Sequence, residues 1–94
     1  MQTAIVVDDE PNLVNYLVSK LGILWPELEI SGTSNSGLHA ITLAQSLKPD
    51  IVFLDIQMPG LNGLQVAEKL PIGTKIVFVT AFDQYAVEAF NKSA

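Results

Sequence analysis

The run Ile51-Val52-Phe53-Leu54-Asp55 is continuously apolar and ends in a carboxylate, and Ala4-Ile5-Val6-Val7-Asp8-Asp9 repeats this pattern near the start of the chain. Continuous runs of β-branched and apolar residues are typical of the central strands of a parallel sheet. In a doubly wound α/β sheet, neighbouring strands place their carboxyl ends at one edge, where ligands bind. We therefore expect Asp8, Asp9 and Asp55 to converge.

Three converging carboxylates make a cation site the simplest interpretation of this pattern. The carboxylates repel one another and raise one another's pKa unless a cation lies between them. Ligands that offer only oxygen suit a hard ion such as Mg²⁺. The alternative for Asp8 and Asp9 is capping of the following helix, a contribution of about 0.5 to 2 kcal/mol for which one Asp would suffice.

Length and composition indicate one compact domain. The chain has 94 residues, of which 49% are hydrophobic and 16% are charged. It has no cysteine, which excludes disulfides and thiolate metal sites and fits a cytoplasmic location. The apolar stretch near the N-terminus is too short for a signal peptide or a membrane span. With a net charge of −5 and lysine as the only basic residue type, the segment is not expected to contact nucleic acid directly.

Apolar runs of strand length alternate with helical patterns, which favours βα units and a parallel sheet. The predicted strands are residues 3–7, 28–33, 50–54 and 75–79. Helices are expected from Pro11 to just before Trp25, from a capping turn at 34–37 to Lys48-Pro49, and over residues 63–70. A last helix is expected from about Gln84, carrying Val87 and Phe90.

Three motifs together carry a family resemblance. They are Asp8-Asp9, the stretch from Asp50 to Gly60 that contains Met58-Pro59-Gly60, and Val79-Thr80-Ala81. In this order they resemble the receiver domain of two-component response regulators over essentially the whole chain. Residues 78–90 are similar, more narrowly, to receivers attached to LytTR-type DNA-binding domains. The resemblance implies a flavodoxin-like fold and a signalling switch.

The resemblance also implies a role for each matching residue. Asp55 would be the phosphoacceptor, taking a phosphoryl group from a histidine kinase. Asp9 would bind Mg²⁺ directly, Asp8 would bind it or position it through water, and the backbone carbonyl of Gln57 would complete the protein ligands. Thr80 would hydrogen-bond a phosphoryl oxygen and draw the following loop inward. A DNA-binding output domain that regulates transcription would lie outside this segment.

One departure from the family concerns the end of the sheet. The family has a Lys followed by Pro after a fifth strand, and Lys48-Pro49 stands elsewhere in the order of elements. The chain is therefore interpreted as one receiver domain, 1–94, with strand order 2-1-3-4 and without the fifth strand and fifth helix. We expect the edge at 76–79 to be exposed. The chain is then either a homodimer or marginally folded.

Two other functions remain open at this stage. A Mg²⁺-dependent phosphohydrolase with an aspartate nucleophile would resemble the haloacid dehalogenase group, which carries Asp-x-Asp after its first strand, whereas this chain reads Asp8-Asp9-Glu10. A non-phosphorylatable interaction domain is the second alternative, because the family's Lys is missing. His39 is interpreted as a solvated surface residue.

Overall fold

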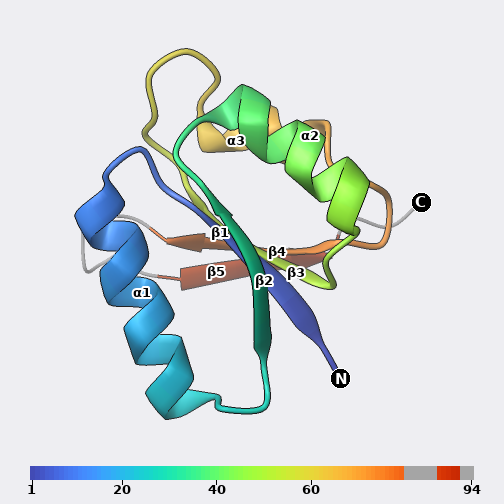
Figure 1. Ribbon diagram of the computed structural model, residues 1–94. Helices are drawn as coiled ribbons and strands as arrows, with labels where there is room; N and C mark the ends of the chain where they lie inside the picture. Colours follow the sequence, from blue (N-terminus) through green and yellow to red (C-terminus); the bar gives the residue numbers. More distant parts are fainter. Residues whose placement is uncertain (80–86, 92–94) are drawn as a thin grey trace.

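The computed structural model describes residues 1–79 and 87–91, which form one sheet with helices on both of its faces (Figure 1). The strands are β1 (Thr3–Val7), β2 (Glu29–Ser34), β3 (Ile51–Asp55), β4 (Lys75–Val79) and β5 (Val87–Asn91). Their order is β2-β1-β3-β4-β5. β1 pairs in parallel with β2 and β3, and β3 pairs in parallel with β4. The predicted order 2-1-3-4 of the parallel strands is confirmed.

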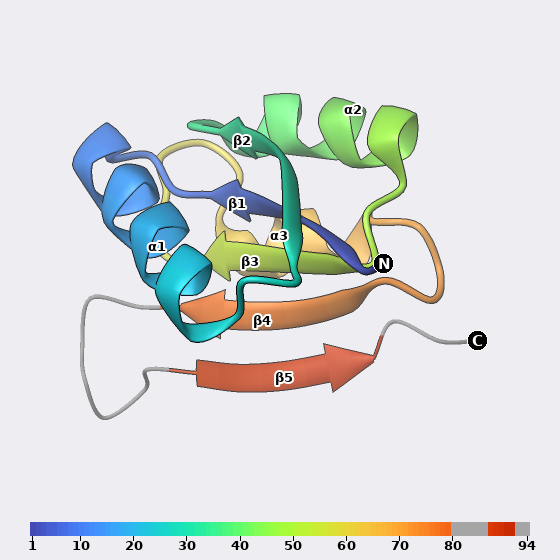
Figure 2. The same ribbon diagram turned by 60° about the horizontal axis from the view of Figure 1, so that its bottom comes forward.

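The helices lie on opposite faces of this sheet, as Figures 1 and 2 show. They are α1 (Pro11–Leu24), α2 (Gly37–Leu47) and α3 (Gly63–Glu68). α1 covers one face, and α2 with α3 covers the other (Figure 2). This is the doubly wound arrangement, in which ligands bind beyond the carboxyl ends of the strands.

The two central strands are buried on both faces, and their side chains alternate between two hydrophobic clusters. Every residue of β3 is buried, and so is every residue of β1 after the first. Because successive side chains point to opposite faces of a sheet, alternate residues join the cluster under α1 or the cluster under α2 and α3. The α1 cluster takes Ala4, Val6, Ile51 and Phe53. The opposite cluster takes Ile5, Val7, Val52 and Leu54.

Each helix begins at a recognisable signal. Pro11 occupies the first turn of α1, where its missing N–H costs nothing. The Ser36 side chain accepts the N–H of His39 and caps α2, and Asn62 with Gln65 forms a complete capping box at α3. The helix starts predicted at Pro11, in the turn 34–37 and at residue 63 are confirmed. The strands predicted at 3–7 and 75–79 are also confirmed, and the other two are displaced by one residue.

The segment at Val87–Asn91 differs from the sequence prediction. It forms β5, which pairs antiparallel with β4, so the helix predicted from Gln84 through Phe90 is wrong over these residues. After four parallel strands, β4 still offers a row of unpaired backbone N–H and C=O groups, and pairing them outweighs the local helical pattern. The edge at 76–79 is therefore covered, with Ile76 only 2% exposed, and its predicted exposure is also wrong.

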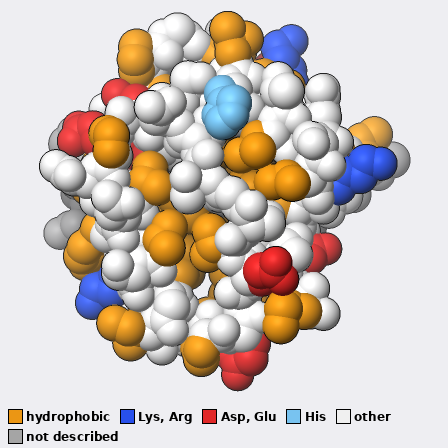
Figure 3. Space-filling view, in the orientation of Figure 1, with side chains coloured by type: hydrophobic (Ala, Val, Ile, Leu, Met, Phe, Trp, Pro, Cys, Tyr) orange, Lys and Arg blue, Asp and Glu red, His pale blue; other side chains and the backbone are white. Residues whose placement is uncertain are grey.

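The surface carries apolar side chains beside these covered elements. Figure 3 shows hydrophobic groups between α1 and β2 and along α2, with the histidine on the surface over the start of α2. On α1, Tyr16, Ile23 and Leu24 are exposed. Among the described residues, none of the helices is both long enough and apolar enough to cross a membrane.

Candidate functional site

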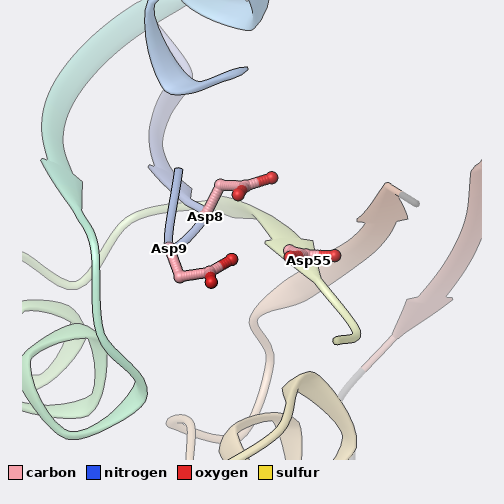
Figure 4. Close-up of side chains that lie close together, drawn as sticks. All are labelled: Asp8, Asp9 and Asp55. Carbon is pink, nitrogen blue, oxygen red and sulfur yellow. The ribbon is translucent and has the colours of Figure 1, made fainter. Parts of the chain in front are cut away.

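The site is built by the ends of β1 and β3. Val7 lies opposite Leu54 in the parallel ladder, so Asp8, which follows β1, and Asp55, the last residue of β3, lie side by side at one edge of the sheet. One carboxylate oxygen from each of Asp8, Asp9 and Asp55 can be chosen so that all three lie within 4.8 Å of one another. Figure 4 shows the three side chains directed into the same space beyond the strand ends. The predicted convergence is confirmed.

Backbone hydrogen bonds hold two of these carboxylates. The Oδ1 of Asp8 accepts the N–H of Glu10 at 2.9 Å, which fixes the turn between β1 and α1. The Oδ1 of Asp55 accepts the N–H of Gln57 at 3.2 Å. The N-cap of α1 is Glu10, whose side chain makes no capping bond, so the capping alternative explains only the turn at Asp8.

The carboxylates are in an environment that disfavours their charge. The pKa of Asp55 is raised to about 6, chiefly by burial and also by repulsion from Asp8 and Asp9, while the hydrogen bond from the Gln57 N–H opposes the rise. The side chain of Asp55 is 9% exposed. Burial also raises the pKa of Asp8, against the hydrogen bond from Glu10. A cation among the three oxygens would relieve the repulsion and favour the ionised forms.

The donor set fits Mg²⁺. Three carboxylates supply hard oxygen ligands within 4.8 Å of one another, and Mg²⁺ characteristically takes one or two protein carboxylates and keeps several waters. Among the described residues that carry His, Cys, Asp or Glu, this is the group placed to hold an ion.

Gly63 supports the site, and the sequence prediction did not single it out. A Cβ at this position would overlap the carbonyl oxygen of Asp55 and lie 2.8 Å from the Cα of Ile56. The Gly63 N–H donates to the Ile56 carbonyl at 2.8 Å. The first turn of α3 therefore lies directly against the backbone of the phosphoacceptor candidate. The sequence feature that could have indicated Gly63 is the Asn62-Gly63 pair, a capping residue followed by glycine at the helix start.

Ser34 is a second residue that the sequence prediction passed over. Its carbonyl accepts the N–H of Asp8 at 3.1 Å, and its hydroxyl contacts Nδ1 of His39 at 2.8 Å. Ser34 is 5% exposed, and it was interpreted only as part of a turn. His39 is exposed, as expected, and lies outside the carboxylate cluster.

The remaining predicted site residues lie in different places. Gln57 follows Asp55 and is exposed, with its N–H directed to Asp55. Thr80 lies outside the described residues. Lys48 ends α2 in the left-handed conformation, with φ of 47°, and belongs to the helix terminus and not to the site.

A comparison with protein families decides what this arrangement is. The model of the response regulator receiver domain matches residues 4–94. The chain belongs to the response regulator receiver family. Its three carboxylates thus lie in a receiver domain, which is a phosphoacceptor signalling module.

Characterised and uncharacterised relatives share this receiver domain. It is 45% identical over 93 residues to the positive alginate biosynthesis regulatory protein of Pseudomonas aeruginosa, covering 96% of this chain and 38% of that protein. It is 38% identical over 100 residues to the transcriptional regulatory protein BtsR of Escherichia coli, covering 100% and 40%. An uncharacterised response regulatory protein of Vibrio cholerae is 44% identical over 95 residues, covering 98% and 36%. The receiver domain spans well under half the length of these relatives.

Solved structures agree with the fold. Response regulator TrrA of Thermotoga maritima, crystallised in complex with Mg²⁺ and BeF, superimposes with a TM-score of 0.79 at 38% identity, over 90% of this receiver and 74% of that chain. The response regulator domain of Thermotoga maritima CheB gives a TM-score of 0.74 at 28% identity, over 92% and 66%. The flavodoxin-like fold is confirmed.

Proposed function

We propose that this receiver accepts a phosphoryl group on Asp55 with the help of Mg²⁺ held by Asp8, Asp9 and Asp55. The observation that carries the proposal is the convergence of the three carboxylates beyond β1 and β3. The complex of the related protein TrrA with Mg²⁺ and BeF supports a cation in this family of sites. The backbone carbonyl of Gln57 would complete the protein ligands.

The residues divide the chemistry among them. A carboxylate oxygen of Asp55 attacks phosphorus, a new P–O bond forms, and the bond from phosphorus to the donor breaks, which for a phosphohistidine is the P–N bond. Mg²⁺ supplies charge neutralisation at the phosphoryl oxygens when it is bound. The N–H of Gln57 holds Oδ1 of Asp55 and so fixes the direction of the other oxygen. Asp8 and Asp9 hold the negative charge that draws a cation to the attacking group.

The wider role follows from the relatives. Two of them are named as regulatory proteins of biosynthesis or transcription, and the receiver spans under half of each. We propose a histidine kinase as phosphoryl donor and a DNA-binding output domain as the element that phosphorylation controls. Thr80 is proposed to hydrogen-bond the phosphoryl group, and attachment to a LytTR-type domain is the narrower proposal. A cytoplasmic location fits these partners.

Incubation with acetyl phosphate and Mg²⁺, followed by intact-mass measurement, tests the proposal. The expected result is one phosphoryl adduct that is stable in acid, labile in base and absent in Asp55→Asn. Asp50→Asn is the matched control, because Asp50 lies just before the opposite end of β3, where its carboxylate accepts hydrogen bonds from the N–H and hydroxyl of Thr3. An adduct that persists in Asp55→Asn, or that maps to His39, overturns the assignment.

A further inference from the structure

The hydroxyl of Ser34 lies at the centre of a small hydrogen-bond network beside the carboxylates. It donates to the carbonyl of Ser36 at 3.0 Å and lies 3.3 Å from the Ser36 N–H. Its third partner is Nδ1 of His39 at 2.8 Å. A hydroxyl has one proton and two lone pairs, so all three contacts are satisfied when Nδ1 of His39 carries a proton and donates. The imidazole is then oriented by a buried oxygen.

The same serine is bonded to the turn that carries two of the carboxylates. Its carbonyl accepts the N–H of Asp8 at 3.1 Å, which is the last bond between β1 and β2 before the chain turns. Asp8 is thus held by two backbone bonds: one through its own N–H to Ser34 and one through its carboxylate to Glu10.

Side-chain packing does not fill the space on this side of the turn. An open pocket of about 280 Å³ lies between the start of α1, at Pro11, Val14 and Asn15, and the end of β2 with His39. Beside this pocket, the hydrogen bonds of Ser34 help to locate the end of β2 relative to Asp8.

We infer that His39 is a positioning residue for the carboxylate site, acting through the Ser34 hydroxyl and carbonyl on Asp8. Partners behind a metal ligand fix its orientation and are costly to remove. Here His39 acts on Asp8 through the end of β2. The imidazole orients the Ser34 hydroxyl, and the hydroxyl fixes the turn that leads into α2. The carbonyl of the same serine holds the N–H of Asp8. This inference rests on the proposed Mg²⁺ site.

A purely structural role for His39 predicts different results. His39 is the third residue of α2, and its N–H already donates to the capping Ser36 side chain at 3.2 Å. If its ring only extended this cap, its loss would change the stability of α2 and leave Asp8 untouched. Two measurements at Asp8 and its neighbours separate the two roles.

The first measurement is Mg²⁺ affinity, followed by backbone amide shifts at Asp8, Asp9 and Asp55. His39→Ala is expected to weaken Mg²⁺ binding by about tenfold, at the low end of the effect usual for partners behind a metal ligand. His39→Asn is expected to restore affinity, because its amide nitrogen can donate from near the place of Nδ1. Gln45→Ala, exposed on the same helix, is the control and should bind as the wild type does.

The second measurement needs no metal. Amide-proton exchange at Asp8 should be several-fold faster in His39→Ala than in the wild type, with exchange at Val7 unchanged. The melting temperature should change little, since the higher helix propensity of Ala offsets part of the cost of the lost hydrogen bond.

The outcomes separate this inference from the function on which it rests. Wild-type affinity and wild-type Asp8 exchange in His39→Ala overturn the positioning role. Absence of Mg²⁺ binding by the wild-type chain overturns the proposed function, and the exchange at Asp8 then still decides the role of His39.

Discussion

The backbone of Gly63 lies directly against the carbonyl group of Asp55. A Cβ at Gly63 would overlap that oxygen, and the Gly63 N–H closes the loop by donating to Ile56. The loop that follows Asp55 is thus held at both of its ends, by the end of β3 and by the start of α3.

Replacing Gly63 by Ala should therefore destabilise the fold. Backbone atoms of Asp55 and Ile56 would have to move, a cost of about 1 to 3 kcal/mol that outweighs the helix propensity gained. Gly22→Ala is the matched control, because nothing lies within 4 Å of a Cβ there, and it should stabilise by about 0.5 to 1 kcal/mol. Urea unfolding of both variants measures the difference. Equal effects of the two substitutions on the free energy of unfolding would contradict the close backbone contact at Gly63.

Mg²⁺ should bind weakly and perturb a small set of amides. Most of its coordination is left to water, since the described site offers three carboxylates. Titration followed by amide shifts should give changes clustered at Asp8, Asp9 and Asp55, and Asp9→Ala should remove them. Glu29→Gln, exposed on β2, removes one negative charge elsewhere and should leave the titration unchanged. Shifts spread evenly over the surface would show only general attraction to an acidic protein.

Stability should rise as the pH falls from 7 to 5. The pKa of Asp55 is about 6 in the folded chain, against an ordinary value of 3.8. Between these values the folded state binds a proton that the unfolded state does not, so the free energy of unfolding increases on acidification and levels off below about 4. Asp8, whose pKa is also raised, adds in the same direction.

Urea unfolding at several pH values, with and without Mg²⁺, measures this effect. Saturating Mg²⁺ should reverse it, because protons compete with the cation for the carboxylates. Asp55→Asn should flatten much of the dependence. A wild-type stability that falls between pH 7 and pH 5 would show that Asp55 is not held in this environment.

The antiparallel strand β5 can be distinguished from a helix by NMR. Val77 lies opposite Ala89 and Ile76 opposite Phe90, so cross-strand contacts between backbone protons of these pairs are expected. Sedimentation should accompany this measurement, because pairing with β5 covers the β4 edge, and dimers that form through β4 are then not expected. If contacts appear between residues three apart within 87–91 and the cross-strand contacts do not, these residues form the helix that the sequence predicted.

The parallel core and the carboxylate cluster could be predicted because each depends on strong local patterns. Two apolar runs that each end in Asp predict both the central strands and the meeting of their ends. Pro11 and the serine-rich turn at 34–37 likewise mark helix starts through their own chemistry.

The features that escaped prediction depend on tertiary contacts. The segment Val87–Asn91 has a helical pattern, and only the open edge of β4 gives its backbone a better set of partners. Gly63 and Ser34 have ordinary loop and turn identities in the sequence. Their importance comes from distances to Asp55 and Asp8, which lie on other elements.

The pairing of β1 with β2 skips one residue. Ala4 pairs with Ile30, but Ile5 pairs with Gly32, which leaves Ser31 as an extra residue in the edge strand. In a regular strand without this bulge, Ile30 and Gly32 would point to the same face, whereas Ile30 packs in the α1 cluster and a Cβ at Gly32 would lie 3.1 Å from Leu47 of α2.

This extra residue shifts the register of the rest of β2 by one position. Val7 pairs with Ser34 because of the skipped residue, and an uninterrupted ladder would bring Thr33 opposite Val7 in its place. The alignment of the acidic turn with the serine carbonyl is thus set four residues upstream along β1. A one-residue insertion or deletion in β2 would therefore change the geometry of the acidic pocket without altering any residue that lines it.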